Sequence, residues 1–201
     1  PWRTKEIPQI TRFNLTLPKT DALDLTTYSA LTISPDGSRI VYRANSRLYM
    51  RTLDNIDAVA IPGTEEGGSP FFSPDGRWIG FFAAGKLKKV SVSGGTPIAL
   101  AEAPDNRGGT WGPDGIIVFT PTAISGLMRI PEAGGVAESV TTPDSAQKER
   151  THRWPHFLPD GINVIFTMGS TESPDYYEGA TIEVVNLKTG ARKVLIRGAS
   201  T

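Results

Sequence analysis

The residues best suited to metal or acid–base chemistry in this sequence are its two histidines, His152 and His156. A spacing of four residues places two histidines on one face of a helix, as in some zinc sites. The neighbouring residues are instead typical of a strand. On a strand, a spacing of four residues keeps both side chains on one face, but at roughly 3.3 Å per residue it places them about 13 Å apart. Two imidazoles at that distance cannot share one metal ion. The sequence therefore predicts no metal site and a structural or channel-lining role for His152.

Other catalytic motifs are absent from the sequence. A serine hydrolase of the nucleophile-elbow type needs Gly-x-Ser-x-Gly, and a phosphate-binding loop needs Gly-x-x-x-x-Gly-Lys-[Ser/Thr]; neither occurs. The His-Arg-Asp signature of protein kinases is also missing. Without cysteine there is no thiol nucleophile, thiolate-bound zinc or disulfide. We therefore expect no catalytic residues and no cofactor in this segment.

A repeated turn motif organises the chain. Pro-Asp-Gly occurs four times, and its aspartates are separated by 39 (36 to 75), 39 (75 to 114) and 46 (114 to 160) residues. Proline presets the backbone for a tight turn, aspartate tolerates the second central position, and glycine supplies the positive φ that closes a hairpin. We interpret these residues as structural turns: Asp36, Gly37, Asp75, Gly76, Asp114, Gly115, Asp160 and Gly161.

Aromatic and β-branched residues flank each turn, and two further strand-like runs follow it, which predicts four-stranded antiparallel units of about 40 residues. Such sheets bury both faces by stacking around an axis, so the fold class is all-β, a β-propeller. The predicted blades cover residues 27–62, 67–102, 108–142 and 151–198, within a single domain or fragment that spans residues 1–201. Residues 142–151 are expected to form a loop, and residues 10–17 an additional N-terminal strand.

Four repeats leave the ring arrangement open. The chain could be a partial propeller, a closed four-bladed ring, or an open ring completed by a second chain. A truncated ring exposes apolar blade faces, which favours a homo-oligomer.

The loops that enter the innermost strands should gather at one end of the ring, where a protein, a peptide or a small polar ligand could bind. Solvated loop charges with no ligand are the alternative interpretation. The candidate ligand-binding residues at this channel mouth are Glu65, Glu66, Asp105, Arg107, His152 and Arg153.

The charge balance argues against nucleic acid as a partner, because 21 basic residues face 21 acidic ones and a nucleic-acid binder usually carries a basic excess. No apolar run reaches the roughly 18 residues that a membrane-spanning helix needs.

Two stretches, SPDGRWIGFFAAGKLKKVSVSGGTPIALAEAP and TWGPDGIIVFTPTAISGLMRIPEAGG, resemble the WD40-like, TolB-type propeller repeat. The wider pattern, from ITRFNLTLP to HRWPHFLPDG, resembles the exported C-terminal propeller sensor region of bacterial serine/threonine protein kinases. This resemblance implies a non-catalytic binding module in a larger, membrane-anchored bacterial protein, with an extracytoplasmic location. The alternatives are the propeller of a prolyl-oligopeptidase-like peptidase and a stand-alone propeller hydrolase or lyase.

Overall fold

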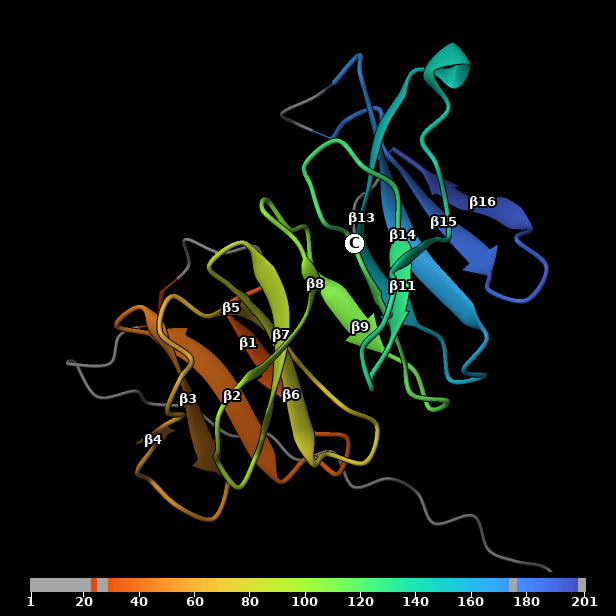
Figure 1. Ribbon diagram of the computed structural model, residues 1–201. Coiled ribbons are helices and arrows are strands. Elements are labelled where there is room, and N and C mark those ends of the chain that lie inside the picture. The colour runs from red at the N-terminus through yellow and green to blue at the C-terminus, as the bar shows by residue number, and fades with distance from the viewer. Residues whose placement is uncertain (1–22, 25–28, 174–176, 199–201) are drawn as a thin grey trace, which may run out of the picture.

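The computed structural model describes residues 23–24, 29–173 and 177–198, which form four antiparallel sheets of four strands each (Figure 1). Within these ranges the only helical element is a 3-10 turn, Ser145–Gln147. The predicted all-β propeller architecture is confirmed, although the ring of sheets is not closed. The N-terminal strand expected at residues 10–17 lies outside the described residues.

Each sheet, called a blade here, follows chain order from its first strand to its last. Blade 1 contains β1 (Leu31–Ile33), β2 (Arg39–Ala44), β3 (Arg47–Thr52) and β4 (Val59–Ala60). Blade 2 contains β5 (Gly68–Phe72), β6 (Trp78–Ala83), β7 (Lys86–Ser91) and β8 (Ile98–Glu102). Blade 3 contains β9 (Gly109–Trp111), β10 (Ile116–Phe119), β11 (Met128–Pro131) and β12 (Glu138–Ser139). Blade 4 contains β13 (Glu149–Phe157), β14 (Asn163–Ser170), β15 (Thr181–Asn186) and β16 (Arg192–Arg197).

The Pro-Asp-Gly turns join the first two strands of every blade. In blade 2 the Gly76 amide donates to the Ser73 carbonyl at 2.8 Å, and Gly76 has a φ of +67°, which the absence of a Cβ permits. The Ser73 hydroxyl donates to Asp75 at 2.6 Å and accepts from the Trp78 amide at 2.9 Å. These bonds keep the Asp75 carboxylate ionised, since the Ser73 hydroxyl and then the Arg77 amide lower its pKa. The turn thus fixes the register of the hairpin.

The first strands lie nearest the axis: β1 lies beside β5, β5 beside β9, and β9 beside β13, so the sheets follow one another along an arc (Figure 1). Hydrophobic residues fill the three seams between successive blades. The seam of blades 1 and 2 contains Val41, Leu48 and Phe81, that of blades 2 and 3 contains Leu87 and Phe119, and that of blades 3 and 4 contains Leu127 and Phe166. All seven side chains are fully buried, at 1% exposure or less.

The last blade presents an apolar face that no described blade covers. In blade 4, Ile182 of β15 occupies the position that corresponds, by strand register, to Leu48, Leu87 and Leu127 in the first three blades. Each of those three leucines is buried against the following blade. Ile182 is only half-buried, and Ile196, which pairs with it on β16, is 52% exposed. The open edge of the arc therefore carries residues of the type that pack a seam.

Candidate functional site

A groove of about 780 Å³ runs along the axis, between the innermost strands of the four blades. This volume lies within the range of roughly 300–1,000 Å³ that ligand pockets occupy. Because the arc is open, the groove is bordered by β1 on one side and by β13 on the other. The side chains that line it include Leu31, Ile33, Phe72, Trp111, Trp154 and His156.

No aspartate, glutamate, lysine or arginine is among the described residues that line this groove. Its polar side chains are neutral hydroxyl groups and one imidazole, from Ser69, Thr32, Thr110 and His156 among others. The lining also includes one proline from each of the four hairpin turns: Pro35, Pro74, Pro113 and Pro159. A charged group inside this groove would lose water without gaining an ionic partner from the described lining.

The edge of β1 adds backbone groups to the groove. The Ser34 amide donates to the Arg39 carbonyl, and the Arg43 amide donates to the Ala30 carbonyl, both at 2.8 Å. Antiparallel ladders alternate, so the residues between these bonded positions direct their N–H and C=O groups away from β2. Those residues include Leu31 and Ile33, which are 46% and 50% exposed and line the groove.

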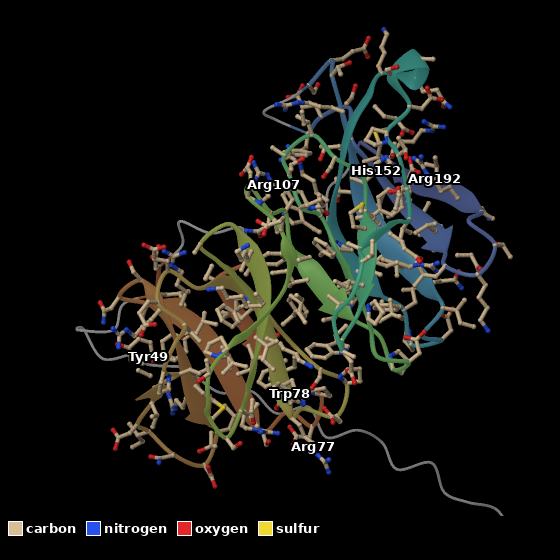
Figure 2. The ribbon with its side chains drawn as sticks, viewed as in Figure 1. Tyr49, Arg77, Trp78, Arg107, His152 and Arg192 are labelled. Carbon is tan, nitrogen blue, oxygen red and sulfur yellow. The ribbon has the colours of Figure 1, made fainter. Side chains whose placement is uncertain are left out.

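At the opposite end from the proline turns, the predicted channel-mouth arginines are buried. Arg107 is 8% exposed, and its guanidinium donates to the Asp105 carboxylate at 2.5 Å and to the Asp105 and Asn106 carbonyls at 2.9 and 2.8 Å. Figure 2 shows Arg107 near this end and Arg77, which follows the turn of blade 2, near the other. The Arg107 guanidinium therefore organises its own loop.

Arg153 is held in a similar way, at 6% exposure. It donates to the Thr151 hydroxyl at 3.1 Å, to the Ala123 carbonyl at 2.8 Å and to the Tyr177 hydroxyl. The Tyr177 ring lies 5.2 Å from that of Trp154, which lines the groove. Arg153 thus braces the mouth and supports one groove wall.

The three acidic candidates at the mouth are exposed. Glu65 approaches Arg47 at 4.0 Å, and the Glu66 amide donates to the Ser46 carbonyl at 2.6 Å. Asp105 pairs with Arg107, whose hydrogen bond lowers the pKa of this carboxyl group. The structure therefore brings Asp105, Arg107 and Arg153 to one part of the rim, whereas the two glutamates lie on the loop that enters blade 2.

The two histidines do not share a face, contrary to the sequence prediction. A β-bulge between Arg153 and His156 inserts one residue into β13, and Trp154 at the bulge has a φ of +52°. The insertion reverses the alternation, so His152 is fully buried against blade 3 while His156 is exposed in the groove. The channel-lining role considered for His152 is therefore wrong, and His156 takes that position.

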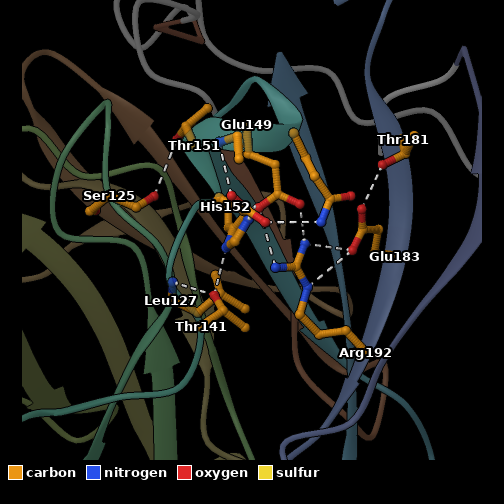
Figure 3. A network of polar contacts seen from close by, with 12 residues as sticks. Ser125, Leu127, Thr141, Glu149, Thr151, His152, Thr181, Glu183 and Arg192 are labelled. Atoms are coloured by element: carbon orange, nitrogen blue, oxygen red, sulfur yellow. Dashed lines mark hydrogen bonds and ion pairs between the residues drawn. The ribbon is translucent and has the colours of Figure 1, made fainter. Parts of the chain in front are cut away.

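His152 belongs to a buried polar network between blades 3 and 4 (Figure 3). Thr141 Oγ1 accepts from the Leu127 amide at 2.9 Å and lies 2.6 Å from His152 Nδ1, while His152 Nε2 lies 3.0 Å from Glu149 Oε2. An ionised carboxylate only accepts hydrogen bonds, so His152 Nε2–H donates to Glu149. Burial lowers the pKa of His152 and favours the neutral imidazole, in which Nδ1 accepts from the Thr141 hydroxyl.

Arg192 connects the carboxylates of this network. Its guanidinium donates to Glu149 Oε1 and to Glu183 Oε2, both at 2.8 Å, and it lies over the Phe166 ring. Burial alone would raise the pKa of Glu149, but hydrogen bonds from Arg192, the Asp144 amide and His152 hold that pKa below its usual value. Burial lowers the pKa of His152, and the charge of Arg192 lowers it further against the opposing effect of Glu149.

In the described part of the chain, no group of three or more histidine, aspartate or glutamate residues could hold a metal ion, and no helix is long and apolar enough to cross a membrane.

No family model and no curated protein sequence matches the chain. Solved structures with the same fold include an oligogalacturonate lyase in complex with manganese, with a TM-score of 0.65 and 18% identity over 90% of this chain and 55% of that one. TolB from Acinetobacter baumannii has a TM-score of 0.65 and 17% identity, over 86% and 45% of the two chains. The fold that the chain shares with these structures is a β-propeller.

A third similar structure is the β-propeller domain of Cps50 (Swd1) from Myceliophteria thermophila, with a TM-score of 0.64 and 11% identity over 92% of this chain and 59% of that domain. The chain thus spans about half the length of the propellers that it matches. At these identities the likeness concerns the fold.

The sequence did not indicate that Trp111, Trp154 and His156 would line a shared groove. A local signal existed, since all three lie on or beside innermost strands. The sequence instead drew attention to charged loop residues, because neutral residues that line a groove cannot be told from core residues in the sequence.

Proposed function

We propose that this chain is a non-catalytic binding module that holds a protein segment, a peptide or a small polar ligand in its axial groove. The observation that carries this proposal is the groove of about 780 Å³ whose described lining has no charged side chain. Rigid elements from four blades build its walls, and Arg153 and Tyr177 brace the mouth. A preorganised wall of this kind lowers the entropic cost of binding.

Two tryptophans in the wall make occupancy measurable. Trp111 and Trp154 both line the groove, so a ligand there changes the intrinsic tryptophan emission. The probes are a phage-displayed library of random peptides and a panel of neutral oligosaccharides. Leu31→Lys places a charge at the groove, at a side chain exposed enough to tolerate it, and Ile56→Lys is the matched control at an 80% exposed position outside the lining.

The proposal predicts binders whose emission signal and affinity are lost with Leu31→Lys and retained with Ile56→Lys. Binders whose affinity changes with neither substitution would show that the binding site lies elsewhere and would refute the proposal. If no probe binds the wild-type chain, the groove is not a ligand site for these classes and the proposal fails.

The proposal extends to the context of the module, which is the sensor part of an exported, membrane-anchored bacterial receptor kinase. Its support is the sequence resemblance, which extends from Ile10 to Gly198. Sequencing the intact gene tests it: an upstream kinase domain and a membrane span support the sensor, and a downstream α/β domain with a nucleophile elbow would favour the peptidase instead.

We also propose that a second copy covers the open face of blade 4. Half-buried Ile182 and exposed Ile196 occupy positions that form seams in the other blades, which supports association through this face. Sedimentation should show a dimer that Ile196→Lys converts to a monomer, whereas Ile56→Lys stays dimeric. A wild-type monomer at all concentrations would overturn this part.

A further inference from the structure

We infer that the occupant of the axial groove is an extended peptide segment that pairs through its backbone with the groove-facing edge of β1 and is uncharged over the part inside the groove. This inference rests on the proposed binding function and names its ligand class. The juxtaposition that carries it is a strand edge, at Leu31 and Ile33, that no described strand pairs with and that faces a groove of peptide-binding size without charged aspartate, glutamate, lysine or arginine side chains.

The edge of β1 offers hydrogen bonds at strand spacing. The bonds of Ser34 and Ala30 with β2 fix which residues of β1 face away from β2, so Leu31 and Ile33 present N–H and C=O groups to the groove two residues apart. The Leu31 carbonyl also accepts from the Ser29 hydroxyl at 3.3 Å, so the Leu31 amide and both groups of Ile33 are the main sites for pairing. Two residues of strand correspond to roughly 6.6 Å, which is the repeat that a neighbouring strand needs for its own donors and acceptors. An exposed edge of this kind recruits an added strand in many peptide-binding domains.

Neutral lining sets the side-chain chemistry of that segment. Apolar side chains, among them Phe72 and Trp111, form much of the wall, and the described lining provides no counter-charge for an ionic side chain. A lysine or glutamate held inside would lose its hydration without compensation, which makes charged residues unfavourable there. The loops at the mouth are exposed at Glu65, Glu66 and Asp105, so charged residues of the peptide on either side of its central part can remain in water.

A peptide fits this site better than a neutral sugar does. A sugar offers hydroxyl groups in many directions and is usually met by several polar side chains. Here the polar side chains are few, mainly Thr32, Ser69, Thr110 and His156, and Thr110 Oγ1 already accepts a bond from the Phe157 amide at 3.3 Å. The regularly spaced donors and acceptors belong to the backbone of β1.

The first experiment removes one edge donor. Ile33→Pro deletes the amide that faces the groove, and β1 retains its bonds to β2 because that amide points away from them; proline is tolerated on such edges. Ile33→Val, which keeps the amide, is the matched control. The probes are the peptides that the phage library yields on the wild-type chain, with dissociation constants measured by tryptophan emission and folding verified by melting temperature.

We expect a Kd about 3- to 10-fold higher with Ile33→Pro than with Ile33→Val, which is the effect of one lost backbone hydrogen bond. The selected peptides should lack charged residues in their central part. Equal affinity for the proline and valine variants, or charged residues in the central part, would overturn the inference while leaving the groove as a binding site.

The second experiment does not depend on how the proline variant folds. Each backbone amide of a selected peptide is methylated in turn and tested on the wild-type chain. Strand pairing predicts that methylation lowers affinity at every second residue, because only those amides face β1. A uniform response along the peptide would overturn the inference. If only oligosaccharides bind in the groove, the inference falls and the proposed binding function stands.

Discussion

Arg192→Leu is expected to destabilise the protein severely, because it leaves two buried carboxylates without their shared cation. The side chains of Glu149 and Glu183 are only 6% and 5% exposed, and Arg192 donates to both. Leucine keeps some of the packing over Phe166 but supplies no charge and no donor. The network in Figure 3 would then hold two anions with one neutral histidine between blades 3 and 4.

The magnitude follows from the cost of an unpaired buried charge. Removing one partner of a buried ion pair costs about 3–5 kcal/mol. Arg192 is itself 25% exposed, so water can reach part of the site, and the lower value of about 3 kcal/mol is appropriate. In a chain of this size each kcal/mol corresponds to about 2–4 °C, which gives a fall in Tm of about 6–12 °C.

The assay is calorimetric melting of the wild type, Arg192→Leu and the control Arg197→Leu, which changes an exposed arginine on the same strand. Adding Glu149→Gln and Glu183→Gln to Arg192→Leu removes the unpaired charges and should restore part of the loss. If Arg192→Leu melts within about 1 °C of Arg197→Leu, the network does not stabilise the blade seam and the reasoning is refuted.

Three further predictions concern pH, a turn and a close contact. Burial lowers the pKa of His152, so the unfolded state binds more protons than the folded state and the wild-type Tm should fall as the pH drops from about 6.5 to 5. Calorimetry should show a smaller fall for His152→Gln. An equal dependence of Tm on pH in the two proteins would contradict this prediction. Ser73→Ala leaves the Trp78 amide without its hydroxyl acceptor and should cost about 1–2 kcal/mol in urea unfolding, whereas unaltered stability would show that the turn does not need this bond. A Cβ on Gly126 would lie 1.9 Å from the Thr141 carbonyl oxygen, so Gly126→Ala should lose about 2 kcal/mol or more by the same method, and a fully stable variant would disprove the contact.

The blades could be predicted from the sequence because their signals are local and repeated. Each Pro-Asp-Gly turn fixes a hairpin through neighbouring bonds, as Ser73 and Asp75 show, and the apolar runs around it specify strands. The strand β13 was less predictable. It begins at Glu149, inside the segment expected to be a loop. It also contains a bulge near Trp154 that no local sequence feature predicts.

The groove and the buried network depend on geometry that the local sequence does not contain. Glu149 and Arg192 are 43 residues apart in the chain, so their pairing follows only from how blade 4 folds on itself. The groove likewise exists only because four inner strands meet around one axis. Arg107 and Arg153 were expected at a ligand-facing mouth, and their burial against carbonyl groups became visible only in the folded loops.

Amide hydrogen exchange can show whether the axial groove is a ligand site. The measurement compares the exchange of the amides of β1, β5, β9 and β13 in the free chain with that in the chain saturated with a peptide selected on it. We expect the Leu31 and Ile33 amides to exchange rapidly in the free protein and to slow markedly on binding, because they face the groove. Unchanged exchange at both residues, with protection elsewhere on the surface, would contradict it.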